Sequence, residues 1–501
     1  MFNEYVWQLY LKAGGENVVR VFEDNLAKTF SESYPGFIAN LQSVYCPSGS
    51  LTDGTAKELF DLYNDLHDGL SLAPKEECGT RQEAMAIFRS WLQDGERFTD
   101  KDIFGCFSGS VSYCTTLLSI MFPSLFIPYY FLFNFNVLER ITADFEIILP
   151  QIPVKKDYKG RLDYYGEICA ALLDFADKHN MSRYELCAFL YDFAPQYIGG
   201  TDSYIINNLP EPKSAFFIGG SENDSFYSEK PETVTPWQCS PDTLAGDMIV
   251  MYLKSPVSSV NSVWRSVSIG FNDPFFFYYR CTYIGRPVVI KKVSQKQLQR
   301  DEVFKNVPIV RKNMQGVNGV ELKPSEYNHL MDMAEARDVP RLQFALTDGG
   351  ADLANEKDVE NKLVKPLISK LGYSDGEYVQ QLYIEIGNHN HALIPDFALL
   401  PVTERGHQSA FVLIEAKYAI INSKAMDEVR IQARSYARQL NARYSVIASK
   451  DKIWVYAPDD DFTQEVFEST WSGLDDADVF SVLFKLIGKD MKFFHGKRRS
   501  A

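Results

Sequence analysis

Apolar residues recur at helical spacing through much of the first two hundred positions. Intervals of three and four residues separate them in four stretches, at 16–30, 55–70, 82–94 and 163–178. This spacing gives a helix one apolar face that packs against a core. Ser182 and Glu185, just ahead of the apolar run at 186–191, have the spacing of a capping box. The pattern therefore predicts a mostly helical domain over residues 1–210.

One long stretch of this region has no charged side chain at all. It runs over the 36 residues from Ile103 to Leu138. A helix that spans a bilayer needs about 20 consecutive apolar residues. Here Pro123 and Pro128 interrupt the apolar run, and Ser, Thr and Asn are scattered through it. We interpret the stretch as buried core or a protein-contact surface, and expect no membrane span.

The middle of the chain, residues 211–336, has strand and turn patterns instead. Turn residues follow Trp237 and lead into the apolar run 248–252, which indicates a buried strand. Five aromatic residues stand in a row at 275–279, and alternation along a strand would bury at least half of them. Residues 312–320 combine two glycines with several amides, which predicts a loop.

The last part of the chain, 340–501, alternates between the two patterns. A helical pattern at 358–371 is followed by strand-like stretches at 377–386, 395–400 and 411–417, a helix at 424–440, and further strands at 445–449 and 452–457. Pro366 predicts a kink or break in the first helix. This order favours a mixed sheet flanked by helices. Prolines near 207–213 and the polar stretch near 336–341 mark the expected domain boundaries.

The candidate chemistry lies in two of these last strands. Asp396 enters one strand, and Glu415 and Lys417 end the next. Residues two apart on a strand point to the same face, where Asp396 can meet them. Two carboxylates there suit Mg²⁺, and a Lys beside it can orient or deprotonate water and offset phosphate charge. The alternative is a structural salt bridge at a strand end.

The region 350–490 resembles the nuclease domain at the N-terminus of type I restriction enzyme R subunits, which has the PD-(D/E)xK motif. The matching residues are 355–359, 362–367, 371–373, Pro395-Asp396, Ile414-Glu415-Ala416-Lys417 and Gln432-x-x-x-Tyr436. The resemblance implies a restriction-endonuclease-like α/β fold and a Mg²⁺ (or Mn²⁺) cofactor. It also implies metal ligation by Asp396, Glu415 and the Ala416 carbonyl, a catalytic Lys417, and supporting roles for Glu356, Gln432 and Tyr436. Glu360 departs from the family, which has a basic residue there; it is either a surface charge or a second acidic group one turn along the helix.

The segment 212–335 resembles EVE-type domains, which are PUA-like β-barrels related to YTH readers. The resemblance rests on Trp237, Gly246-Asp247, Asp273-Pro274 with its aromatic run, and 315–319. It implies a pocket for one modified base, in which aromatic faces replace the lost base stacking. The candidates are Trp237, Trp264 and Tyr252 for the pocket walls, with Gln315 and Asn318 for the base edge. Barrel core for the aromatics, and loop structuring for the amides, remain the alternatives.

Charge separates the three regions. The chain carries −15, and counting basic against acidic side chains gives −12 for 1–214, 13 against 13 for 215–335, and −3 for 341–501. An acidic N-terminal domain is a poor binder of DNA backbone, so we expect homo-oligomer or defence-partner contacts there. An ordinary acidic scaffold is the alternative. The balanced middle suits a pocket reader better than a backbone-tracking groove.

Together these features predict a multidomain, metal-dependent endodeoxyribonuclease of a prokaryotic anti-phage restriction system that reads modified bases in DNA. No phosphate-loop motif is present, so no ATP site is expected. Met1–Glu4 lacks a leader pattern and the eight cysteines form no C-x-x-C pair, which favours a cytoplasmic protein. Two alternatives stay open: a nuclease triggered by a nucleotide signal or RNA, and a DNA-binding adaptor without catalysis.

Overall fold

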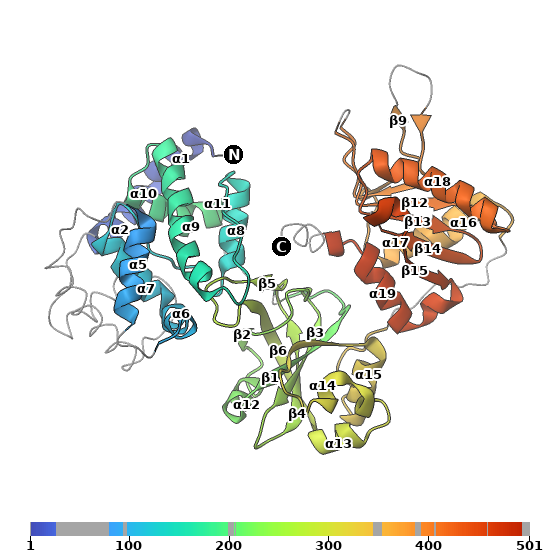
Figure 1. Ribbon diagram of the computed structural model, residues 1–501, viewed down its shortest axis with the longest axis horizontal. Helices are drawn as coiled ribbons and strands as arrows, with labels where there is room; N and C mark the ends of the chain where they lie inside the picture. The colour runs from blue at the N-terminus through green and yellow to red at the C-terminus, as the bar shows by residue number, and fades with distance from the viewer. Residues whose placement is uncertain are drawn as a thin grey trace. The chain divides into compact units, whose positions relative to one another are not determined.

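The computed structural model describes residues 2–26, 80–93, 98–198, 205, 207–343, 353–385, 392–404, 407–457 and 459–492 (Figure 1). The helix predicted at 55–70 lies outside these residues. The chain divides into two compact units. Unit 1 comprises Met1–Leu209, Glu232–Ala245 and Ser266–Arg286, and unit 2 comprises Pro210–Pro231, Gly246–Arg265 and Pro287–Ala501.

The N-terminal region of unit 1 is helical, as predicted. Its helices often begin with a side-chain cap, and the box predicted at Ser182 is confirmed: Glu185 N–H donates to Ser182 Oγ at 3.2 Å, and Ser182 N–H donates to Glu185 Oε2 at 2.7 Å. Such caps satisfy backbone donors that a helix start leaves free. The α-helices are α1 (Glu4–Tyr10), α2 (Glu16–Leu26), α5 (Arg81–Leu92), α6 (Asp100–Gly109), α7 (Val111–Met121), α8 (Phe135–Asp144), α9 (Tyr158–Lys178), α10 (Arg183–Ala188) and α11 (Ala194–Tyr197).

The uncharged stretch forms α6, α7 and the beginning of α8. Many of its apolar side chains, among them Phe104, Phe107 and Leu118, are buried in the helical core. Among the described residues, no single helix has the length and apolar character needed to cross a membrane. Helices α6 and α7 pass that test only as a pair, bent by 89°.

The aromatic run belongs to this helical core, and the expectation that it forms a strand was wrong. Residues 273–279 make turns between β5 (Phe271–Asn272) and β6 (Arg280–Ser294). The physical reason is Asp273, whose Oδ1 accepts the backbone N–H groups of Phe275 (2.8 Å) and Phe276 (3.1 Å). These bonds hold the backbone in a turn, and a turn competes with strand pairing. Phe275 is fully buried among the helices, 4.7 Å from the Tyr129 ring.

A buried arginine fastens this turn to α9. Arg161 is fully buried and donates to the carbonyl oxygens of Pro274 (2.9 Å), Phe276 (2.5 Å) and Lys155 (3.0 Å). Its guanidinium also lies 4.1 Å from the centre of the Phe104 ring. The three carbonyls and the ring face supply the partners that a buried cation requires.

The middle segment contributes to a seven-stranded mixed sheet of order β2-β6-β4-β3-β1-β7, with β5 on β6. Strand β6 begins in unit 1, where it pairs with β2 and β5, and ends in unit 2. Strands β1 and β3 are parallel, and their alternate residues, such as Phe217, Val250 and Tyr252, face the core of unit 2. The other strands are β1 (Ala215–Gly220), β2 (Val234–Trp237), β3 (Met248–Leu253), β4 (Ser259–Ser266) and β7 (Asn318–Leu322).

Three short helices complete this core within unit 2. They are α13 (Gln295–Arg300), α14 (Pro308–Arg311) and α15 (Pro324–Met333). Leu298, Val310 and Leu330 bring one apolar residue from each into the core cluster. The polar sides of α13 and α14 therefore remain at the surface.

The C-terminal part of unit 2 is a second mixed sheet, of order β15-β14-β13-β12-β11-β8. Strands β12 and β13 are parallel because α18 (Ser423–Gln439) makes the crossover between them. Val429, Ala433 and Ala437 of α18 pack on the sheet. The strands are β8 (Tyr378–Gln380), β11 (Phe397–Leu399), β12 (Val412–Ala416), β13 (Tyr444–Ala448), β14 (Lys452–Tyr456) and β15 (Glu465–Thr470); β9 (Ile384–Glu385) pairs with β10 (Ala392–Leu393), and α19 (Ala477–Ile487) ends the region.

The first helical stretch of this region is continuous through Pro366. It consists of α16 (Glu356–Val359), the π-helical turn η5 (Glu360–Val364) and α17 (Lys365–Lys370), with Pro366 in the first turn of α17. The break, one of the two predicted alternatives, does not occur, and a π-helical turn stands just before the proline. The kink remains a prediction. The single strand predicted at 377–386 was wrong: β8 and β9 form there and belong to different sheets. The other predicted elements occur in the predicted order.

Candidate active site

The predicted triplet converges at one end of the strand pair β11 and β12. The strands are antiparallel with Phe397 opposite Ile414, which brings Asp396 beside the end of β12. Asp396 Oδ2 accepts the backbone N–H of Ala416 at 2.7 Å. Lys417 Nζ donates to Glu415 Oε1 at 2.8 Å and to the Ala416 carbonyl at 2.9 Å. Glu415 and Lys417 therefore share a face, as predicted from their spacing.

The helix before the sheet brings two more carboxylates to this point. Glu356 Oε1 lies 3.6 Å from Lys417 Nζ. Carboxylate oxygens of Glu356, Glu360 and Asp396 all lie within 4.8 Å of one another. Asn355 caps the helix by accepting the N–H of Asp358 at 3.0 Å, which fixes where its first turn starts.

Glu360 is the residue that sequence reasoning left undecided, and the surface-charge alternative was wrong. Only 5% of Glu360 is exposed, and its Oε2 accepts the side-chain N–H of Gln380 at 2.5 Å. Its spacing of four residues from Glu356 was the available signal, because residues four apart share one helix face. Gln380, on β8, was not predicted; it fixes the Glu360 carboxylate from the neighbouring strand.

Burial and mutual repulsion raise the carboxyl pKa values here. Burial, followed by the charge of Asp396, raises the pKa of Glu415 to about 7, although the Lys417 hydrogen bond opposes this. Burial also raises the pKa of Asp396, with Glu360 and Glu356 adding to the rise. Burial alone would lower the pKa of Lys417, but its hydrogen bond to Glu415 and the surrounding carboxylates raise it. Three carboxyl groups, those of Glu415, Glu356 and Asp396, thus surround the Lys417 ammonium group.

The donor set fits a hard divalent cation. Glu415 is 3% exposed, and its Oε2 is buried without a hydrogen-bond partner among the described residues. An unpaired buried carboxylate oxygen is costly unless a cation meets it. The carboxylate oxygens that lie within 4.8 Å of one another belong to Glu356, Glu360 and Asp396, and Glu415 is not in this group. The Lys417 ammonium contacts Glu415 and the Ala416 carbonyl, the two other ligands implied by the sequence.

Gln432 and Tyr436 lie on one face of α18, as predicted. Gln432 Nε2 donates to the Tyr436 hydroxyl at 2.9 Å, and Tyr436 is buried against the sheet. This hydrogen bond joins the two side chains to each other and does not reach the acidic residues. Their supporting role toward the acidic residues therefore remains a prediction.

The five predicted base-binding residues differ in accessibility. Trp264 is 1% exposed and donates to Ser262 Oγ at 3.1 Å, which favours the alternative of core packing. Tyr252 is also buried, and its hydroxyl lies 3.2 Å from Gln295 Oε1. Trp237 on β2 and Asn318 on β7 are half-buried, whereas Gln315 is exposed. Base recognition by these residues remains a prediction.

Comparison with known proteins adds little to this geometry. No family model matches the chain, and no curated protein matches it. A solution NMR structure of a protein from Rhodopseudomonas palustris is 9% identical, over 25% of this chain and 94% of that one, with a TM-score of 0.22. A crystal structure of a protein from Agrobacterium tumefaciens is 14% identical, over 26% of this chain and 97% of that one, with a TM-score of 0.23.

Proposed function

We propose that this protein is a metal-dependent endodeoxyribonuclease of an anti-phage restriction system, directed to DNA by modified bases. The observation that carries the proposal is the meeting of Asp396, Glu415 and Lys417 at one strand end, with a buried carboxylate oxygen left unpaired. The finer assignments belong to the same proposal: a restriction-endonuclease-like C-terminal fold, a PUA-like reader of the EVE type, and a cytoplasmic location.

The residues that would hold Mg²⁺ or Mn²⁺ are Asp396 and Glu415, with Glu356 and Glu360 from the helix and the Ala416 carbonyl. When bound, the cation supplies positive charge that polarises a phosphoryl oxygen. The Ala416 N–H holds the Asp396 carboxylate in place, and the Gln380 amide holds that of Glu360. Groups positioned in this way need no reorganisation when the substrate arrives.

Lys417 carries the remaining chemistry. Because its neighbours raise its pKa, the amine is protonated at neutral pH and cannot act as a general base in that form. This favours orienting the attacking water and offsetting phosphate charge over deprotonating the water. A scissile phosphate brought to this strand end would meet the Lys417 ammonium group, which lies among the carboxylates of Glu415, Glu356 and Asp396.

The deciding experiment is a cleavage assay with the full chain on phage DNAs that carry plain, methylated, hydroxymethylated or glucosylated cytosine, in Mg²⁺ and in EDTA. Lys417→Ala should reduce cleavage by at least about 100-fold and leave DNA binding intact. Lys452→Ala is the matched control, because Lys452 is a half-buried lysine of the same sheet that pairs with Glu468 at 2.6 Å. Unchanged cutting by Lys417→Ala refutes the assignment.

The same assay separates the alternatives. Cleavage of unmodified plasmid only after addition of a nucleotide or RNA would replace base modification as the trigger. If the chain binds DNA but cuts none of the tested DNAs in the presence of metal, the protein is a DNA-binding adaptor without catalysis.

A further inference from the structure

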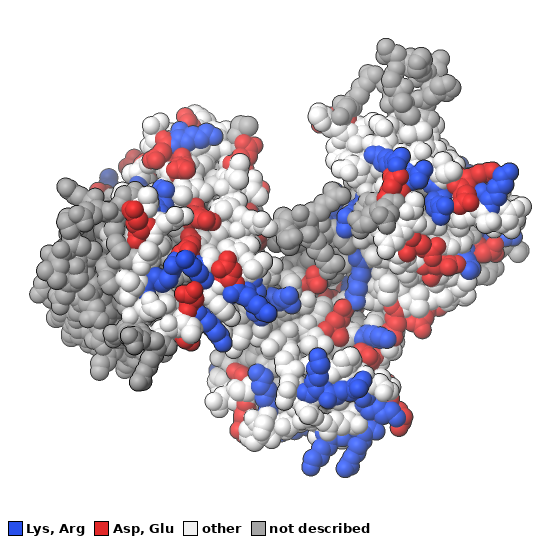
Figure 2. All heavy atoms as spheres, in the orientation of Figure 1, with Lys and Arg blue, Asp and Glu red and all other residues white. Residues whose placement is uncertain are grey.

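Basic side chains concentrate in one short part of the middle segment. Residues 291–312 contain seven Lys and Arg against two acidic residues, a net charge of +5, within a segment that is neutral as a whole. All seven basic residues are exposed. Figure 2 shows blue side chains gathered over α13 and α14. The equal numbers of basic and acidic residues over 215–335 do not reveal this local excess of positive charge.

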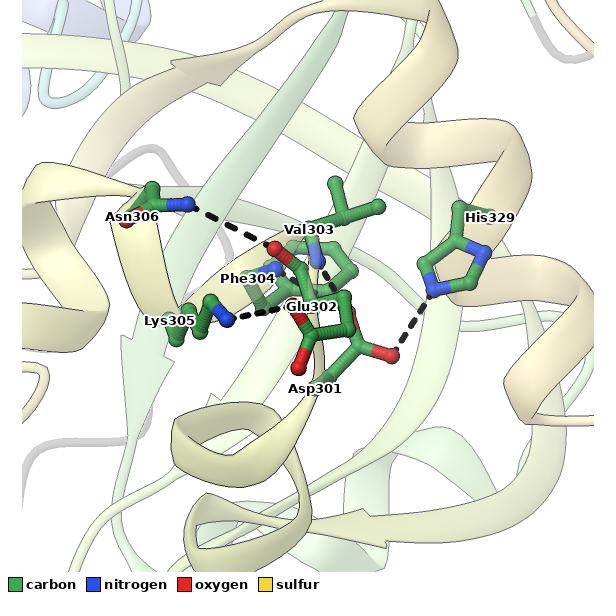
Figure 3. Close-up of polar contacts among 7 residues, drawn as sticks. All are labelled: Asp301, Glu302, Val303, Phe304, Lys305, Asn306 and His329. Atoms are coloured by element: carbon green, nitrogen blue, oxygen red, sulfur yellow. Dashed lines mark hydrogen bonds and ion pairs between the residues drawn. The ribbon is translucent and has the colours of Figure 1, made fainter.

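The two acidic residues in this stretch already have partners (Figure 3). Asp301 Oδ1 accepts the N–H groups of Val303 and Phe304 at 3.0 Å each, and its Oδ2 lies 2.9 Å from His329 Nε2. Burial would raise the pKa of Asp301, but these bonds lower it, so it is ionised and fully engaged. Glu302 forms an ion pair with Lys305.

Five cations remain after the ion pairs are counted. Lys305 pairs with Glu302, and Lys291 pairs with Glu335. In the part of the chain that the structure describes, no carboxylate forms an ion pair with the other five, which are Lys292, Lys296, Arg300, Arg311 and Lys312. We call these five residues the basic surface. Their charge is available to a partner.

Side-chain amides hold the basic surface together. Gln299 Nε2 donates to Asn313 Oδ1 at 2.8 Å, and Gln295 Nε2 approaches the same oxygen at 3.5 Å. These bonds tie α13, which carries Lys296 and Arg300, to the turn that follows Arg311 and Lys312. Asn313 and Met314 both have positive φ there, at 54° and 58°. Amide groups between cations are typical donors to phosphate and sugar oxygens.

We propose that the basic surface binds the phosphate backbone of DNA and holds the duplex beside the base-reading domain. The proposal rests on the proposed function for the identity of the nucleic acid, and it adds a surface that the pocket alone does not supply. Tyr252, predicted to bind a base, contacts Gln295 beside this surface. Gln315, also predicted to bind a base, donates its backbone N–H to the Lys312 carbonyl at 3.0 Å in the turn that follows α14. Phosphate contacts position a duplex and raise affinity without reading sequence.

The test uses the full chain and a fluorescent DNA duplex in EDTA, which prevents cleavage, over a range of salt concentrations. Lys296→Gln/Arg300→Gln and Arg311→Gln/Lys312→Gln each remove two cations. Each pair should make the slope of log affinity against log salt shallower by about 1.8. A fourfold rise in salt should therefore weaken the binding of either variant roughly tenfold less than it weakens the binding of the unaltered chain. The loss should be equal for plain and modified duplexes, because phosphates carry no sequence information.

The matched control is Lys291→Gln/Lys305→Gln, which removes the same charge from two lysines that already have partners. It should bind like the unaltered chain. Equal slopes for all variants, an equal loss in the control, absence of DNA binding, or stronger binding to an RNA duplex of the same length would each overturn the proposal.

The binding test can fail or succeed independently of the cleavage assay. If the basic-surface variants bind normally while Lys417→Ala abolishes cutting, the surface assignment fails and the nuclease assignment stands. If the surface variants lose binding but no metal supports cutting, the reverse holds.

Discussion

The backbone N–H of Ala416 donates to the carboxylate of Asp396 across the β11–β12 pair at 2.7 Å. This bond holds the Asp396 carboxylate against the end of the strand that carries Glu415. It also uses only one oxygen of Asp396. The meeting of Asp396 and Glu415 thus follows from the pairing of β11 with β12, and Glu356 and Glu360 join them from the helix before the sheet.

Glu360 is expected to contribute to cation binding. Glu360→Gln should reduce the affinity for Mn²⁺ by about 10–100-fold, the range for residues that tune a metal site. The variant keeps an oxygen for the Gln380 amide, so only the charge changes. The measurement is the rise in melting temperature with added Mn²⁺, read without DNA. Glu377→Gln, an acid of the same unit that pairs with Lys489 at 2.7 Å, is the control. Equal Mn²⁺ responses would exclude Glu360 from the site.

The two tryptophans should give different phenotypes. Trp264 is almost wholly buried, so Trp264→Ala should lower the free energy of unfolding by about 3–5 kcal/mol. Trp237 is half-buried, and Trp237→Ala should leave the fold intact and reduce the preference for modified over plain DNA. Competition binding and urea unfolding measure the two effects. An unaltered preference in Trp237→Ala would remove the reader role from this residue.

The sequence predicted what depends on local pattern. Asp396, Glu415 and Lys417 were found because strand periodicity alone places them on one face. Glu360 was undecided because its burial depends on Gln380, which is 20 positions away in sequence. Phe275 was assigned to the wrong element because a single side chain, Asp273, turns the backbone there. The basic surface was missed because a charge count over 121 residues averages a local excess with acids elsewhere.

Asp273 should make unit 1 less stable at alkaline pH. Burial raises its pKa from 3.8 to about 7, although two backbone N–H groups and Arg161 oppose the rise. The folded chain then binds more protons than the unfolded chain between these values. This contribution to stability is complete below pH 3.8 and is lost as pH rises through 7, on the order of 4 kcal/mol in total. Asp273→Asn should flatten the dependence of unfolding free energy on pH between 4 and 8. A dependence unchanged in the variant would contradict the assignment.

Arg161 should be a main determinant of the stability of unit 1. Arg161→Met keeps much of the side-chain volume but leaves the Pro274, Phe276 and Lys155 carbonyls without their donor. A buried carbonyl left unpaired, such as that of Pro274, costs about 1–3 kcal/mol, and the two partly buried ones cost less, so we expect a loss of about 2 kcal/mol or more in urea unfolding. Cleavage by protease within residues 274–279 should also increase in this variant, because these bonds hold the turn against α9.

Arg140→Met is the control. Arg140 is exposed and makes one such bond, to the Ile198 carbonyl at 3.1 Å, so this variant should lose less than about 1 kcal/mol of unfolding free energy. Equal stability of the two variants would show that the turn is held by Phe275 packing alone.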